Sequence, residues 1–164
     1  MVGSVSHLRP AFRAVIHNLK RWTTADMEPP PSAFLEGDVV TDGPADAIGL
    51  LQTAVDEDGN ALGGLRLPHM EQDVDGEVAG APLGTYTGVN MDTDFPDVFS
   101  DVFVMIGGTF EPFGDDALRA RYPDHETYVE RVRRAAEHLY ETGYIREADR
   151  DAYIREAEES RIGR

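Results

Sequence analysis

Residues 124–160, DHETYVERVRRAAEHLYETGYIREADRDAYIREAEES, form the stretch that decides the fold. Apolar residues recur in it at spacings of three and four, which predicts two amphipathic helices. The first, Glu126–Thr142, follows Asp124 as its N-cap and ends before Gly143. The second is Glu147–Ser160. The side chains expected to face the core are Val129, Val132, Ala136, Leu139 and Tyr140 in the first helix and Ala148, Ala152, Ile154 and Ala157 in the second.

A third helix is predicted near the other end of the chain, over residues 8–22, LRPAFRAVIHNLKRW. Pro10 lies in its first turn, where proline is tolerated. Its large apolar residues fall on one face and are called the apolar stripe below: Phe12, Val15, Ile16, Leu19 and Trp22. The helix must end before Pro29-Pro30-Pro31, because consecutive prolines require an extended linker.

The middle of the chain, residues 23–113, is expected to be mostly irregular with short strands. Asp42-Gly43 and Asp58-Gly59 are turn signals, and Gly63-Gly64 and Gly107-Gly108 indicate positive φ or close backbone approach. The short apolar runs, which are strands or extended segments, are Ile48–Val55, Leu65–Pro68, Leu83–Thr87 and Val98–Phe110. These runs are too sparse for a sheet core. We therefore expect residues 1–164 to be one region that covers a core supplied elsewhere, with a helix at 8–22 and a helical pair at 124–160.

The charge of the chain excludes some partners. Its 31 acidic and 15 basic residues give a net charge of −16, which repels nucleic acid and anionic lipid. A solubility surface and a site for a basic partner or cations are both compatible with this charge, and the scattered acids favour the former. No apolar run reaches the roughly 20 residues that span a bilayer, and the N-terminus has no signal-like apolar core. The absence of cysteine excludes disulfides and thiolate chemistry and leaves localisation open.

The sequence offers no nucleophile of the serine-hydrolase type. Such a serine sits on a strained turn flanked by glycines, G-x-S-x-G. The serines are Ser4, Ser6, Ser32, Ser100 and Ser160, and none has that context.

The histidines provide one weak candidate. His69 follows a glycine-rich turn and Arg66. His17 and His138 lie on predicted helices and are expected at the surface, and His125, at a predicted helix start, is expected to have a local role. No HExxH motif occurs, so a zinc site is not expected.

The remaining acidic and glycine-rich motifs also lack a complete pattern. Residues 56–60, DEDGN, begin like a calcium loop, but Ala61 and Leu67 stand where glycine and the closing glutamate are needed, so a tight turn is predicted. Adjacent acids such as Asp115-Asp116, or Asp92 with Asp94, are expected by chance in so acidic a chain. Lys20 is the only lysine, and no G-x-x-x-x-G-K occurs. We therefore assign no catalytic, cofactor-binding or metal-binding residue and expect no cofactor.

Several blocks resemble a bacterial "alpha/beta hydrolase domain" family of large proteins. The run from Leu8 to Ala14, then Trp22 and a PPPS linker at 29–32, is similar to that family's RPxxRAxxxxLxxW helix and linker. Further blocks in the family's order are VDEDGNALGGLRLP at 55–68, LGTYTGVN at 83–90, GTFEPF at 108–113, Arg121-Tyr122, and residues 128–139. The departures are an acidic insertion at Asp73–Gly80 and Val89 in place of tryptophan.

The resemblance implies the C-terminal part of an α/β-hydrolase-type fold that lacks the nucleophile-bearing sheet. The reactive serine, the acid and the catalytic histidine would lie upstream, and helix 8–22 would be the last helix on the hydrolase sheet. Met1 is compatible with a truncated gene, a misassigned start or a split subunit. The implied function is a structural part of an ester or acyl hydrolase, with an upstream hydrolase core or self-association as its partner. The alternative is a stand-alone noncatalytic binding or scaffold module.

Overall fold

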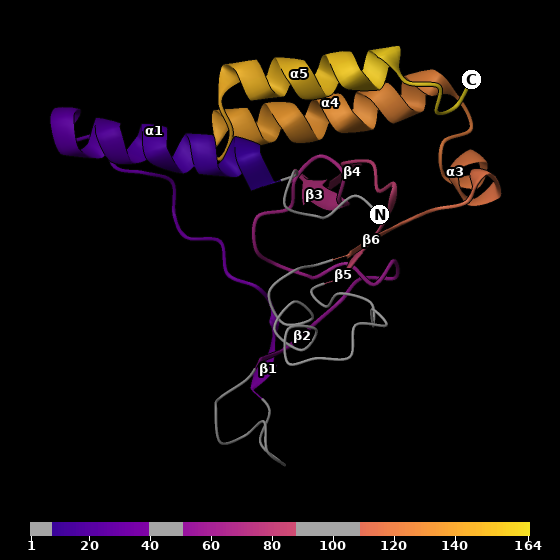
Figure 1. Ribbon diagram of the computed structural model, residues 1–164, viewed down its shortest axis with the longest axis horizontal. Helices are drawn as coiled ribbons and strands as arrows, with labels where there is room; N and C mark the ends of the chain where they lie inside the picture. Colours follow the sequence, from indigo (N-terminus) through magenta and orange to yellow (C-terminus); the bar gives the residue numbers. More distant parts are fainter. Residues whose placement is uncertain (1–7, 40–50, 88–108) are drawn as a thin grey trace, which may run out of the picture.

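The computed structural model describes residues 8–39, 51–87 and 109–164, and within them the fold is mixed α/β (Figure 1). The helices are α1 (Arg9–Ala25), α3 (Asp115–Arg121), α4 (His125–Glu141) and α5 (Glu147–Glu159). The strands are β1 (Gly37–Val39), β2 (Leu51–Thr53), β3 (Gln72–Val74), β4 (Glu77–Ala79), β5 (Gly84–Thr87) and β6 (Thr109–Pro112). They form three separate antiparallel pairs, β1–β2, β3–β4 and β5–β6.

Helices α4 and α5 form the predicted helical pair and lie side by side (Figure 1). The Asp124 carboxylate accepts a hydrogen bond from the Thr127 amide at 2.7 Å, and this bond lowers the pKa of Asp124. Gly143, at φ 83°, follows the end of α4, where a left-handed residue is needed to reverse the chain. The predicted N-cap is confirmed, and both helices match their predicted ranges to within one residue.

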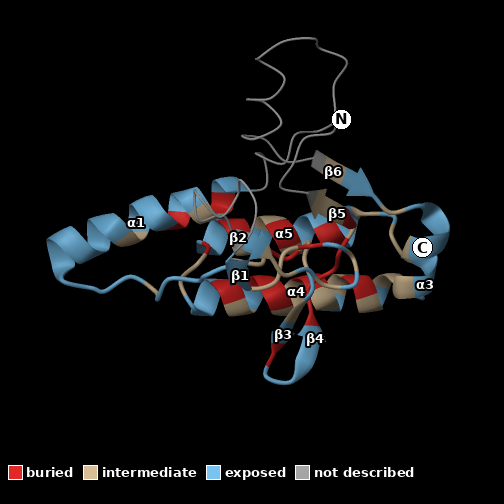
Figure 2. Cartoon of the chain, turned by 90° about the horizontal axis from the view of Figure 1, so that it is seen from below, coloured by how far each residue is buried: buried red, intermediate tan, exposed pale blue. Residues whose placement is uncertain are grey.

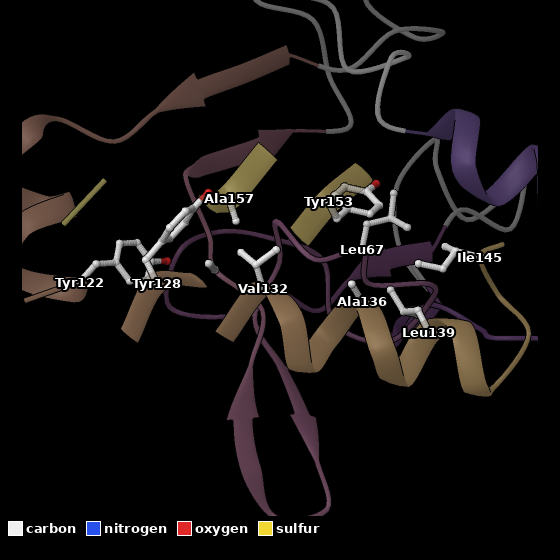
Figure 3. Close-up of a cluster of buried hydrophobic side chains, with 10 residues drawn as sticks. Leu67, Tyr122, Tyr128, Val132, Ala136, Leu139, Ile145, Tyr153 and Ala157 are labelled. Carbon is white, nitrogen blue, oxygen red and sulfur yellow. The ribbon is translucent and has the colours of Figure 1, made fainter. Parts of the chain in front are cut away.

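The main core lies between α4, α5 and the segments that cross them (Figure 3). Its buried residues are Leu67, Ala81, Tyr122, Tyr128, Val132, Ala136, Leu139, Ile145, Tyr153 and Ala157. The Tyr122 hydroxyl donates a hydrogen bond to the Pro82 carbonyl at 2.8 Å, so this buried tyrosine has a polar partner. The core therefore joins α4 and α5 to Leu67 and Ala81, which lie well before these helices in the sequence.

The predicted core faces of the two helices are partly wrong. Tyr140 is 38% exposed, and its ring packs under the Arg150 guanidinium at 4.6 Å. In α5 the buried residues are Asp149, Tyr153 and Ala157, whereas Ala148 is exposed. Asp149, Tyr153 and Ala157 are spaced four residues apart, so they lie on one face of α5, and this is the face that packs against the core.

A hairpin that the sequence analysis treated as an acidic insertion forms β3 and β4. Asp75 and Gly76 both have positive φ, 56° and 80°, which suits a two-residue hairpin turn. The hairpin packs on α4, where the Gly80 amide donates to the Arg131 carbonyl at 2.9 Å and Arg131 Nε donates to the Gly80 carbonyl at 2.8 Å. Asp75-Gly76 was a usable hairpin signal.

The other predictions for the middle section have mixed outcomes. Gly63 and Gly64 have the expected positive φ, and residues 84–87 form a strand. Residues 65–68 are not a strand, although Leu67 and Pro68 are buried, and α3 was not predicted. Residues 51–53 of the run at 48–55 form β2, whereas Asp42-Gly43, Gly107-Gly108, residues 48–50 and most of the run at 98–110 lie outside the described residues. The described ladders have only three or four residues per strand, in agreement with the expectation that the apolar runs are too sparse for a sheet core.

A pair of leucine substitutions tests where the core lies. Leu139 is 3% exposed, so Leu139→Ala removes core contacts and leaves a cavity, and it should destabilise the chain by about 2–5 kcal/mol. Leu19→Ala is the matched control, because Leu19 on α1 is 54% exposed and its truncation should change stability by less than about 0.5 kcal/mol. Urea unfolding followed by circular dichroism measures both values. Equal losses would contradict this placement of the core.

Alkaline unfolding tests the buried tyrosines. Burial raises the pKa of Tyr86 and of Tyr128 from 10.0 to about 12, and it also raises the pKa of Tyr122 and of Tyr153. Between pH 10 and 12 the unfolded chain releases protons that the folded chain keeps, so stability is complete below pH 10 and falls as the pH rises through this window. Circular dichroism and tyrosinate absorbance should show this loss. Tyr128→Phe should weaken it, whereas the exposed-residue control Tyr140→Phe should not.

Candidate functional site

Most of α1 is exposed (Figure 2), and its apolar stripe consists of large apolar side chains that are all at least half exposed. The exposed fractions are 61% for Phe12, 62% for Val15, 69% for Ile16, 54% for Leu19 and 50% for Trp22. Fully burying such a side chain contributes roughly 1.5–3 kcal/mol, so covering the exposed part of all five would contribute about 4–9 kcal/mol. An exposed stripe of this size is typical of an interaction surface.

The side of α1 that faces the rest of the chain is small and polar. Pro10 and Ala14 are its buried residues. Arg13 donates a hydrogen bond to Asp149 Oδ1 of α5, and Asn18 Nδ2 donates to the Gly143 carbonyl at 2.9 Å. The usual arrangement of an amphipathic helix is therefore reversed, because the apolar face points away from the protein's own core.

The stripe continues into a groove between α1 and the proline linker. The groove has a volume of about 440 Å³, and its lining includes Val15, Leu19, Trp22, Pro30 and Leu65. The Tyr144 hydroxyl donates to the Pro31 carbonyl at 2.7 Å and ties the linker to the end of the helical pair. The C-terminal half of α1 extends beyond that pair (Figure 1).

The charge of α1 differs from that of the rest of the chain. Residues 9–25 contain Arg9, Arg13, Lys20 and Arg21 and no acidic residue, although the whole chain carries −16. The apolar stripe is therefore bordered by basic side chains on a protein that is otherwise strongly acidic. A surface that complements it would be apolar with acidic edges.

The structure places His69, the candidate from the sequence, beside the main core. Its ring meets the Tyr153 ring edge-on, with centroids 5.5 Å apart. Burial raises the pKa of Tyr153, and the neighbouring Asp149 carboxylate raises it further, so this phenol stays protonated at neutral pH. His69 therefore packs against a neutral aromatic ring.

Among the described residues, His125 and Ser160 make local structural contacts. His125 Nδ1 lies 2.8 Å from the Ile162 carbonyl oxygen, and His125 Nε2 lies 3.1 Å from the Glu158 carbonyl oxygen. Its ring thereby links the start of α4 to the C-terminal segment. His17 and Ser32 are exposed, and His138 is half-buried on α4. Ser160 Oγ accepts from the Ile162 amide at 3.4 Å. Ser4, Ser6 and Ser100 lie outside the described residues.

The turn at residues 56–60 is confirmed, and its carboxylates are bonded to protein donors. The Gly59 amide donates to the Asp56 carbonyl at 3.0 Å. Asp56 Oδ1 accepts the amides of Asp58 and Asn60 at 3.0 and 2.9 Å, and Oδ2 binds Arg66. Both oxygens of Asp58 bind Arg121. These four oxygens therefore hold the turn in place.

Asn60 is a structural residue that the sequence analysis missed. It is 0% exposed, its Nδ2 donates to the Gly84 carbonyl at 3.3 Å, and its Oδ1 accepts the Tyr86 amide at 2.7 Å. A buried amide of this kind is stable only when its polar atoms are bonded. The asparagine directly after Asp58-Gly59 therefore attaches the turn to β5, and its place in the family-like block at 55–68 was the available signal.

Other kinds of site have little support in residues 8–39, 51–87 and 109–164. In these ranges no group of three or more histidine, aspartate and glutamate side chains is arranged to hold a metal ion. Asp115 and Asp116 are exposed, and Asp116 pairs with Arg119 at 3.1 Å, whereas Asp92 and Asp94 lie outside these ranges. None of the helices described is long and apolar enough to cross a bilayer. The apolar stripe is thus the best-supported candidate site.

Comparison with known proteins agrees with the resemblance read from the sequence blocks. The sequence profile of the alpha/beta hydrolase domain family matches residues 3–155. No curated protein and no solved structure matches the chain. The matched range covers almost the entire chain, and it includes the α1 helix, the turn at 56–60 and most of the helical pair. The chain therefore belongs to the alpha/beta hydrolase domain family.

Proposed function

We propose that this chain is the C-terminal region of an alpha/beta hydrolase acting on ester or related acyl bonds, and that its role is structural. The reacting serine, histidine and acid are supplied by a hydrolase core that precedes it, in the same gene or in a neighbouring chain. Helix α1 packs on that core through the apolar stripe. Alone, the chain has no hydrolase activity.

The reversed polarity of α1 carries this proposal. Five large apolar side chains, each at least 50% exposed, point away from the chain's own core, while Arg13 and Asn18 bind it. The 4–9 kcal/mol estimated above is of the same order as the whole stability of a typical domain, about 5–15 kcal/mol. A partner that covers the apolar stripe would gain this free energy, which explains why such a stripe is exposed in the isolated chain.

The described strands agree with a core supplied elsewhere. A hydrolase nucleophile of this class sits at a strand-to-helix turn at the top of an α/β-hydrolase sheet. The three ladders described in this chain are antiparallel and have three or four residues per strand. None of these ladders offers such a turn with a serine among the described residues, which supports a nucleophile on another part of the protein.

A second candidate, a stand-alone binding or scaffold module, has one observation in its favour. The helical pair has its own closed core, in which Tyr122, Val132 and Ala136 are at most 1% exposed. A stand-alone module should be monomeric or form one defined dimer, and it should melt cooperatively without a partner. The C-terminal hydrolase region should instead associate through its uncovered stripe.

An esterase assay tests the lack of activity. The purified chain should not hydrolyse nitrophenyl acetate or butyrate above the rate of a mock purification, because the described residues hold no complete set of reacting groups. Co-expression with the polypeptide encoded immediately upstream should yield a complex that does hydrolyse these esters. Turnover by the chain alone, at a rate that follows its concentration through purification, would refute the proposal.

A second test addresses the stripe. The isolated chain should self-associate, and Phe12→Ser combined with Ile16→Ser should reduce this association, since both side chains are more than 60% exposed. Val39→Ser combined with Val78→Ser is the matched control, because these residues are 62% and 54% exposed but lie outside α1. Light scattering across a concentration series measures the mass of each. A strictly monomeric wild-type chain would count against an uncovered docking face.

A further inference from the structure

Two polar contacts hold α1 against the helical pair. Arg13 binds Asp149 near the start of α5, and Asn18 binds the Gly143 carbonyl at the end of α4, at 2.9 Å. The two contacts come from positions five residues apart, about one and a half turns along α1. A single contact would allow the helix to pivot. Two separated contacts define both its direction and its rotation about its own axis.

Asp149 is unusual for a residue in an ion pair, because it is nearly inaccessible to solvent. It is 4% exposed, whereas the Arg13 side chain is 55% exposed. Within the described part of the chain, Asp149 Oδ2 is buried without a hydrogen-bond partner. Burying a carboxylate with one oxygen unsatisfied is costly, and such a pair contributes little net stability compared with an apolar residue. A stabilising role alone does not explain this carboxylate.

We propose that Asp149 is a positioning residue that, through Arg13, holds α1 in one orientation with the apolar stripe turned outward. The hydrolase core then meets a preformed docking helix. Preorganisation of this kind lowers the entropic cost of association. The inference rests on the proposed function for the identity of the partner, but the orientation of α1 is a property of this chain alone.

The ion pair should respond differently to the loss of each partner. Arg13→Gln leaves a buried, unpaired carboxylate, whereas Asp149→Asn leaves an arginine that is already half in solvent. Arg13→Gln should therefore lower the melting temperature more than Asp149→Asn does, and the double substitution should recover most of the difference. Arg13→Lys keeps a cation for Asp149 and should preserve the orientation of α1.

Spin labelling measures that orientation directly. The chain has no cysteine, so Lys20→Cys on α1 and Arg155→Cys on α5, both exposed, provide two unique labelling sites. Pulsed electron–electron double resonance measures the distance between the two labels, at a concentration where the chain is monomeric. The doubly labelled chain should give one narrow distance distribution, both without further substitution and with Arg13→Lys. Asp149→Asn should broaden it while the circular dichroism spectrum stays the same. The matched control is Glu147→Gln, an exposed carboxylate in the same first turn of α5, which should leave the distribution narrow.

Each outcome supports or overturns the inference. A broad distribution in the wild-type background, or an unchanged narrow one after Asp149→Asn, would overturn the positioning role. Esterase activity of the isolated chain would refute the proposed function without affecting these distances. A broadened distribution in Asp149→Asn together with an inactive wild-type chain supports both.

Discussion

The packing of α4 against α5 is the constraint on which the rest of the described structure depends. Val132 and Ala136 of α4 and Tyr153 and Ala157 of α5 belong to one buried cluster. The other segments attach to this pair. Leu67 and Ala81 complete its core, the β3–β4 hairpin bonds to Arg131, and Tyr122 closes one end beside Tyr128, at a ring-centroid distance of 5.2 Å.

The way in which α1 is attached to this pair decides which of its faces is exposed. Because the contacts that hold α1 are polar, they use the face opposite to the one that normally binds a core. The five exposed side chains of the apolar stripe lie on a helix whose charged residues are all basic, whereas other exposed apolar residues, such as Phe34 and Val39, lie outside it. The acidic residues are spread over the rest of the chain. In the proposed assembly, the docking helix is therefore basic and apolar, and the rest of the chain carries the acidic charge.

Polar groups hold together the described part of the middle section, in which each strand pairs with one other strand. Asp56, Asp58 and Asn60 bond backbone amides and the guanidinium groups of Arg66 and Arg121, and Asn60 carries this network to β5. Such a network depends on geometry more than on buried apolar area, since each member satisfies the hydrogen bonds of another. This network therefore fixes the conformation of the turn at residues 56–60 and its attachment to β5, although this part of the chain has few apolar residues.

The sequence by itself determined the elements whose signals are local. Helical spacing predicted α1, α4 and α5, Asp124 and Gly143 marked the ends of α4, and Asp58-Gly59 marked a turn, because caps, turns and periodicity depend on residues only a few positions apart. The family blocks were also readable from the sequence, and the match to residues 3–155 agrees with them.

Only the tertiary structure decided which faces are buried. Periodicity defines an apolar face on α1 but does not state whether the chain itself covers it. The contacts of Arg13 and Asn18 turn that face outward. In α5, the alanines suggested one face and the fit of Tyr153 against the core selected another, which also buried Asp149. The physical reason is the same in both cases: burial depends on contacts between residues far apart in the sequence, such as Arg13 with Asp149 and His69 with Tyr153, and no local pattern records them.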